Sequence, residues 1–137
     1  MKIKLSIMLD SIESIKHISQ QKYPAKISWI LAKVIRKMDI YYKEFINTRD
    51  SLIKKYGEVD ESGKMMGVKE EYKNQYFGEI LELMKQDVDI PINPMKFEDI
   101  INDEVKLEPQ YLVNIDWLFG EDNTHYITEV EENAQAS

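Results

Sequence analysis

Two side chains with metal-ligand chemistry lie one helical turn apart near the start of the chain. Glu13 and His17 are four residues apart, so a helix would place both on one face, where such a pair can bind a transition metal. Zinc needs three or four ligands, and the sequence offers no cysteine and one further histidine, His125. The alternative is a solvated helix surface, and we expect no metal site and no cofactor.

Paired carboxylates are the second group that could do chemistry. Such pairs can hold magnesium, or share acid–base work when a cleft raises the pKa of one member. The pairs are Asp87/Asp89, Glu98/Asp99 and Asp103/Glu104. A chain with 25 Asp and Glu contains such neighbours by chance, and it has no glycine-rich phosphate loop, serine-hydrolase motif or metalloprotease motif. We expect no catalytic residue and no enzyme activity.

The charge of the chain is divided between its two parts. Residues 1–56 carry 12 Lys and Arg against 5 Asp and Glu, a balance of +7, and residues 57–137 carry 6 against 20, a balance of −14, which together give the net charge of −7. This asymmetry indicates either a dipole that brings segments of the chain together or a surface that docks a charged partner.

A basic surface is expected beside Trp29. Its cations could contact phosphates while the indole stacks on a base, as in nucleic-acid binding. The cations are Lys22, Lys26, Lys33, Arg36, Lys37 and Lys43. The pI of about 4.9 argues against nucleic acid as the partner. The acidic part could instead imitate a phosphate backbone and occupy a DNA-binding protein, or serve only as a solubilising tail.

Length and composition limit the elements that can position these residues. A chain of 137 residues with 43% hydrophobic residues, 5 Gly and 4 Pro is expected to form one mainly helical α+β domain over residues 1–120. The remaining residues, 121–137, form an acidic tail that we expect to be partly disordered, from residue 133 to the end. The absence of cysteine fits a reducing cytoplasm. No apolar run approaches the ~18 residues of a membrane span, and Asp10 and Glu13 interrupt the segment that a signal peptide would need.

Apolar spacing predicts three helices. The first covers residues 7–19, with Ser6 as its cap. The second covers residues 24–56, with Pro24 as its first residue and Gly57 as its stop. Its apolar stripe is expected to seat on a neighbouring helix, and its wide apolar face is expected to be covered from more than one side. The stripe comprises Leu31, Val34, Met38, Tyr41, Phe45, Thr48 and Leu52.

A mobile turn over residues 57–67 is expected to lead into the third helix, residues 68–86, which forms a long antiparallel hairpin with the second. We expect the two helices to pair through opposite charges. The expected pairs join Lys33, Arg36, Lys37 and Lys43 to Glu70, Glu71, Glu79 and Glu82.

The rest of the chain predicts small elements that flank this hairpin. Residues 88–92 alternate as a short strand, whose partner is either 2–5 or 127–130, and Pro91 restricts it to an edge. Phe97, Ile100 and Ile101 indicate a helical turn. A last helix over residues 109–119 is expected to end at Gly120.

The order of these segments resembles a family of small proteins of unknown function, encoded mainly by bacteriophages of Gram-positive hosts. The segments that carry the resemblance are YPAKISWILAKVIRKM, YKEF, TRDSLIKKYGEVDESG, a VDIPI extended piece and LEPQYLVNIDWLF. The resemblance covers about residues 2–119 and lends no catalytic residue. It implies a viral protein in the host bacterial cytoplasm that acts by binding one macromolecule.

Together these observations predict a non-catalytic protein that binds and inhibits a bacterial host protein, such as a defence factor. The expected contact residues are Glu70, Glu71, Glu79 and Glu82 on the third helix and exposed Trp29, Tyr41 and Tyr42, because aromatic anchors within charged rims carry most interface energy. The alternatives are a virion-assembly chaperone or homo-oligomeric structural protein and, third, a nucleic-acid-binding protein. Stoichiometric binding of a divalent metal would favour an enzyme.

Overall fold

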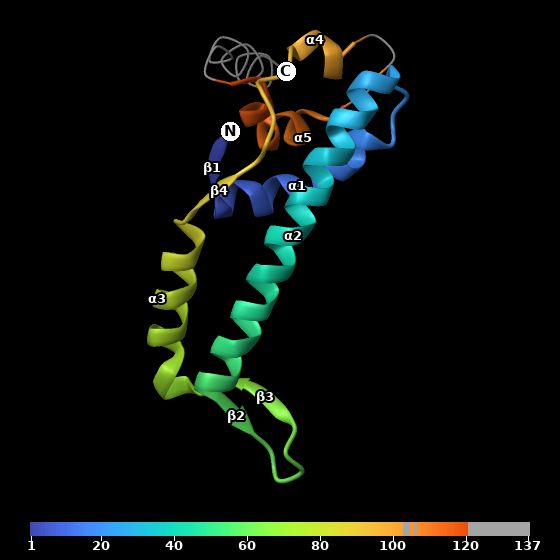
Figure 1. The fold of residues 1–137 in the computed structure, drawn as a ribbon. Coiled ribbons are helices and arrows are strands. Elements are labelled where there is room, and N and C mark those ends of the chain that lie inside the picture. The colour runs from blue at the N-terminus through green and yellow to red at the C-terminus, as the bar shows by residue number, and fades with distance from the viewer. Residues whose placement is uncertain (103–104, 106, 121–137) are drawn as a thin grey trace.

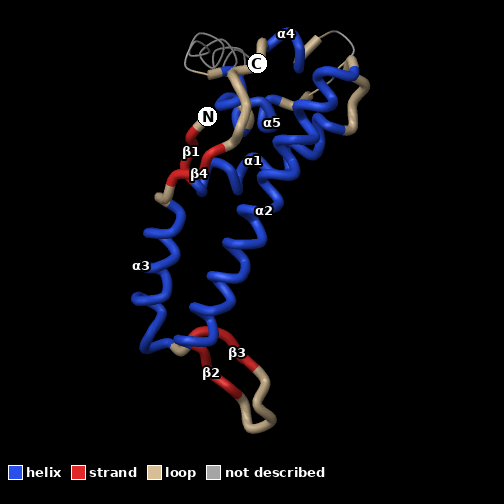
Figure 2. Tube along the Cα trace, viewed as in Figure 1, coloured by secondary structure: helices blue, strands red, loops and turns tan. Residues whose placement is uncertain are grey.

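Helix α2 (Ala25–Tyr56) runs the length of the molecule, and the other elements are arranged along it (Figure 1). The structure, a computed structural model, describes residues 1–102, 105 and 107–120. It is a mainly helical α+β fold, with a long antiparallel helical hairpin and two-stranded sheets (Figure 2), which confirms the predicted fold class. In chain order the elements are β1 (Lys2–Lys4), α1 (Leu5–Ser19), α2, β2 (Gly57–Val59), β3 (Met65–Val68), the 3₁₀ turn η1 (Glu70–Tyr72), α3 (Lys73–Met84), β4 (Asp87–Asp89), α4 (Phe97–Ile100), α5 (Pro109–Asn114) and the 3₁₀ turn η2 (Asp116–Phe119).

The buried core lies at one end of α2. With 32 residues α2 is about 48 Å long, whereas α1 has 15 residues and spans about 22 Å, so α1 can cover only half of α2. The buried residues of α2 all belong to that half and are Ile27, Leu31, Val34 and Met38. Residues from α5 and η2 close the core from the other side, among them Ile115 and Leu118, both fully buried. We call residues 1–41 and the described part of 87–120 the head.

The second half of α2 joins β2, β3, η1 and α3 to form a projection, residues 42–86, that we call the arm (Figure 1). None of the described side chains of the arm is fully buried, and α3 contributes none to the core. The apolar stripe of α2 is therefore buried over its first half only. The rest of the stripe lies beside α3 and is only partly buried, because α1 is too short to cover it as well.

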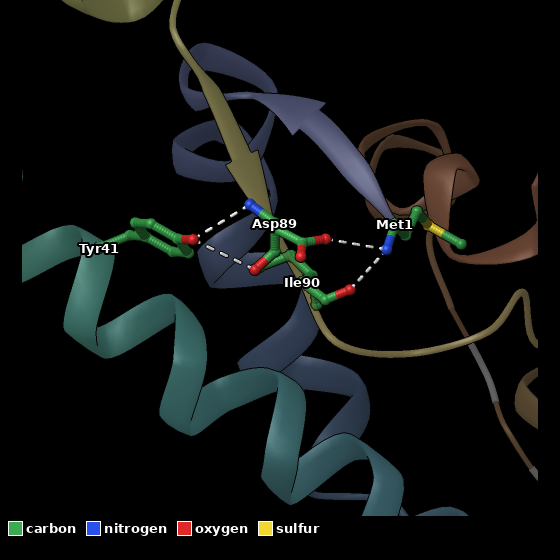
Figure 3. Close-up of polar contacts among 4 residues, drawn as sticks. All are labelled: Met1, Tyr41, Asp89 and Ile90. Carbon is green, nitrogen blue, oxygen red and sulfur yellow. Dashed lines mark hydrogen bonds and ion pairs between the residues drawn. The ribbon is translucent and has the colours of Figure 1, made fainter.

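A small polar cluster ties the head together beside α2 (Figure 3). Strand β4 pairs antiparallel with β1, with Ile3 opposite Val88, as one of the two predicted pairings requires. The Tyr41 hydroxyl of α2 donates to the Asp89 carbonyl at 3.3 Å and accepts from the Asp89 backbone N–H at 3.1 Å. The Met1 amino group lies 3.2 Å from the Asp89 carboxylate. These contacts fasten the two-stranded sheet to the long helix.

The first two helix starts differ from prediction. Helix α1 begins at Leu5, two residues early, because the Leu5 N–H donates to the Gln86 carbonyl at 2.8 Å and needs no side-chain cap. Ser6 therefore lies inside the helix. Pro24 caps α2 instead of opening it, and its carbonyl accepts the first helical hydrogen bond, from Ser28 at 3.1 Å.

The segment after α2 is a β-hairpin, not the turn that its glycines predict. Gly57 has an extended backbone that ends α2 and begins β2, which pairs antiparallel with β3. The Asp60 carboxylate organises the hairpin tip by accepting hydrogen bonds from the Ser62 hydroxyl at 2.7 Å and the Lys64 N–H at 2.8 Å. These bonds lower the pKa of Asp60. Gly63 has a φ of 86°, which a residue with a side chain rarely adopts.

The later elements are shorter than predicted. The third helix begins as η1 at Glu70 and becomes α-helical at Lys73. The helical turn near Phe97 is confirmed as α4. The last helix is interrupted at Ile115, where α5 gives way to η2, and Gly120 ends it with a φ of 76°. The predicted tail, 121–137, lies outside the described residues, as do Asp103, Glu104 and the alternative strand 127–130. In the described residues no helix is long and apolar enough to cross a membrane.

Candidate protein-binding surface

Helices α2 and α3 of the arm enclose a groove of about 690 Å³. Its floor is apolar, with Leu52 and Tyr56 from α2 and Leu83 from α3. Glu79 and Glu82 stand along its α3 side. The groove exists because α3 meets α2 on one side only, and no third helix of the described chain fills the space between them.

Gly78 is the groove residue with open space beside it. It lies within α3 and lines the groove, and a Cβ added there would meet no atom within 4 Å. A glycine inside a helix costs about 1 kcal/mol relative to alanine, so α3 gives up stability at this position. A larger side chain at residue 78 would extend into free space, which makes the position a direct means of filling the groove.

The acidic character of the groove is partly balanced by lysines. Glu79 lies 3.7 Å from Lys55 of α2, and Glu82 lies 3.5 Å from Lys85. The pKa of Lys55 is raised, first by its hydrogen bond with the Tyr56 side chain and then by the Glu79 carboxylate. These pairs are exposed, so each contributes well under about 1 kcal/mol and can exchange for a partner's charge. Each acid of the groove therefore has one lysine partner, and the excess of acids on η1 and α3 comes from Glu70 and Glu71, of which Glu70 is paired with Lys73.

The structure brings together only part of the predicted contact surface. Glu79 and Glu82 share the groove, and Glu70, bound by Lys73, lies at the far end of α3 with Glu71. Trp29 lies 27 residues before the end of α2, which corresponds to about 40 Å along the helix. The acidic and aromatic residues therefore do not form one patch.

The three predicted aromatic residues differ in their surroundings. Trp29 has 60% of its surface exposed, and the Lys33 ammonium lies over its ring at 4.5 Å. Tyr42 has 44% exposed. Tyr41, however, is half-buried and bound through its hydroxyl to Asp89, so the expectation that it is exposed is wrong. Its hydroxyl finds a partner because β4 passes the middle of α2.

The charge pairing predicted between the second and third helices is also wrong. Among the described residues, no ion pair links any of the four predicted cations to the predicted acids. Those cations are Lys33, Arg36, Lys37 and Lys43. The reason is position: they occupy the first two thirds of α2, whereas α3 lies along the second half.

A second hollow, of about 600 Å³, lies in the head between the start of α2 and the extended segment before α4. Its lysines are Lys26, Lys33 and Lys96, and its apolar residues include Ile30 and Ile92. This surface is the structural counterpart of the predicted basic patch. Nucleic-acid binding remains a prediction there.

The residues considered for metal or acid–base chemistry have other contacts. His17 stacks on Tyr111 with ring centroids 4.5 Å apart. The Asp87 carboxylate accepts a hydrogen bond from Lys4 at 2.9 Å, which lowers its pKa. Burial raises the pKa of Asp116, against a hydrogen bond from the Trp117 N–H. The described part of the chain contains no group of three or more potential ligands.

The apolar spacing placed Leu52 on the stripe of the second helix, but it predicted neither a groove there nor a role for Gly78. The available signal was a glycine within an otherwise regular amphipathic helix, which indicates a close approach or a gap. Comparison with protein-family models, with curated proteins and with solved structures found no match to this chain.

Proposed function

We propose that the protein is a non-catalytic viral protein that binds a bacterial host protein through the groove of the arm and thereby inhibits it, a defence factor being the favoured class of target. The observation that carries this proposal is the arm itself: an amphipathic hairpin, 45 residues long from 42 to 86, whose apolar residues have no cover on one side. Ordering such a segment costs conformational entropy, which a bound partner can offset.

The groove favours a particular kind of ligand. A space between two helices with an apolar floor suits one face of an amphipathic helix, which inserts apolar residues at helical spacing. Glu79 and Glu82 favour a ligand with Lys or Arg beside those apolar residues. The partner segment would thus be a basic amphipathic helix of the host protein.

Capture from a bacterial lysate tests the proposal. The bait is the full chain, in wild-type form and as Gly78→Leu, which fills the groove. Asn74→Leu is the matched control, because it adds the same side chain to an exposed position of α3 outside the lining. We expect wild type and Asn74→Leu to retain one host protein in stoichiometric amount and Gly78→Leu to lose it.

The proposal is overturned if the Gly78→Leu bait, shown by circular dichroism to be folded, retains the same host protein as wild type. Fluorescence anisotropy with a labelled peptide from the captured protein then measures the effect. A filled groove should weaken binding by at least about tenfold, equivalent to 1.4 kcal/mol.

A further inference from the structure

Helix α2 carries a largely exposed stripe that begins in the head and reaches the first residues of the arm. Its five residues, spaced alternately by four and three, are Trp29, Lys33, Arg36, Ile40 and Lys43. That spacing places them on one face of the helix, opposite the face that enters the core. Trp29 has 60% and Ile40 51% of its surface exposed, which is unusual for two large apolar side chains on one stripe.

The cations of this stripe form no ion pair among the residues that the structure describes. The Lys33 ammonium lies over the Trp29 ring, and no salt bridge joins Lys33, Arg36 or Lys43 to a described acid. Asp39 and Glu44 neighbour the stripe on α2, and a larger set of acids lies on η1 and α3, in the arm, along the other half of α2. This larger set of opposite charges is therefore present in the chain but separated from the stripe.

The stripe and the groove fit each other in size and chemistry. From Trp29 to Lys43 the stripe spans about 21 Å, and α3 with its 12 residues spans about 18 Å. Trp29 and Ile40 are exposed apolar side chains of the kind that suits the floor of the groove, and the stripe cations are opposite in charge to Glu79 and Glu82 on its α3 side. The stripe thus has the features of the basic amphipathic helix proposed as ligand above.

We propose that the groove of one copy of this chain binds the α2 stripe of a second copy. Each copy has both a groove and a stripe. In a dimer with two-fold symmetry the groove of each copy therefore binds the stripe of the other, and no binding surface is left free for a third copy. The inference rests on the groove being a protein-binding site, as proposed above, and it adds a form of regulation, because self-association and host binding compete for one groove.

Sedimentation velocity on the full chain tests this pairing. We expect the wild type to dimerise with a Kd below about 100 µM. This Kd should rise at least tenfold between low and high salt. Two charge reversals, Glu79→Lys with Glu82→Lys and Lys33→Glu with Arg36→Glu, should each give a monomer. Circular dichroism and thermal melting establish that each variant is folded.

A mixture of the two charge-reversed proteins is the decisive test of this pairing. In a mixed pair both contacts again join opposite charges, so an equimolar mixture should recover the dimer. Glu98→Lys with Glu108→Lys, on exposed head positions, is the control and should remain dimeric. Gly78→Leu blocks the groove without changing charge and should also be monomeric.

A monomeric wild type at 100 µM would overturn the self-pairing, as would a dimer that survives both reversals or a mixture that stays monomeric. If the wild type is monomeric while Gly78→Leu still loses the host protein, the proposed function stands and only the second copy is wrong. If the dimer forms as described but Gly78→Leu retains the host protein, the groove is a self-association site only.

Discussion

The two halves of α2 have the same amphipathic pattern but differ in how far their apolar face is buried. In the head, the apolar face of α2 is buried by α1 and by the C-terminal segments, and its residues are among the least exposed in the protein. In the arm, the same periodicity continues past Tyr41, but the described elements beside it, chiefly α3 and the β2–β3 hairpin, leave every described side chain at least partly exposed. Periodicity therefore identifies which face of a helix is apolar, whereas the lengths of its neighbours decide whether that face is covered.

The comparison implies that the head supplies the stability of the fold and the arm supplies a surface. Burial of apolar area is the main favourable term in folding, so a segment without buried residues contributes little of it. Such segments open locally at lower free energy than the core. The following changes test this division, beginning with the largest expected effect.

The same truncation in the two regions should have very different costs. Leu118→Ala in the head removes a fully buried side chain and should lower the free energy of unfolding by about 3 kcal/mol. Leu81→Ala in the arm, where the side chain is 60% exposed, should lower it by no more than about 0.5 kcal/mol. Urea denaturation measures both. Equal losses would show that the arm is part of the cooperative core.

The boundary between the regions can be tested at two adjacent tyrosines. Tyr41→Phe removes the hydroxyl that binds the backbone of Asp89 and should cost about 1 kcal/mol of unfolding free energy. Tyr42→Phe is the control, since the structure gives that exposed hydroxyl no hydrogen bond, and should change stability by less than about 0.3 kcal/mol. A loss at Tyr42 as large as that at Tyr41 would place the boundary later in α2.

Replacement of a glycine by alanine should stabilise the arm but destabilise the head. Gly78→Ala adds a methyl group in open space within α3 and should raise helix stability by about 0.5–1 kcal/mol. Amide exchange of α3 would report this gain locally. Gly120→Ala in the head should be destabilising instead, because φ is 76° and the new Cβ would lie 3.1 Å from Pro94. A gain at Gly120 would contradict the described backbone there.

The smallest effects concern pH. Asp87 in the head and Asp60 in the arm both have a pKa below the usual value, through Lys4 and through Ser62. A lowered folded-state pKa adds stability above the unfolded value of about 3.9, and that stability is lost as pH falls through the folded pKa.

For Asp87, which joins β4 to β1, this loss should appear in the global melting temperature, and Asp87→Asn should flatten the profile in that range. For Asp60, whose partners are local, Asp60→Asn should change only the exchange of amides in the β2–β3 hairpin. A change in global melting with Asp60→Asn would mean that the hairpin unfolds together with the head.

The sequence predicted what local chemistry determines. The short strand followed from alternation at Val88 and Ile90, and β1 is one of the two partners predicted for it. The end of the last helix followed from Gly120. The long hairpin followed from the apolar stripe and from the glycines after Tyr56.

What the sequence did not predict depends on distances between elements. The predicted charge pairs failed because complementary composition says nothing about where two helices overlap. The groove was not predicted because it depends on how far apart α2 and α3 lie, which the apolar pattern of each helix does not give. Tyr41 was expected at the surface because an aromatic residue on a helix shows no sign of the strand that will pass it.

Hydrogen exchange, measured by mass spectrometry on the dilute protein, tests the division into head and arm most directly. We expect amides of α3 to exchange through local opening, at a free energy well below that of global unfolding. Amides of α1 near Met8 and Ile15 should exchange only when the whole chain unfolds. Protection of α3 equal to that of α1, unchanged by Leu81→Ala, would contradict it.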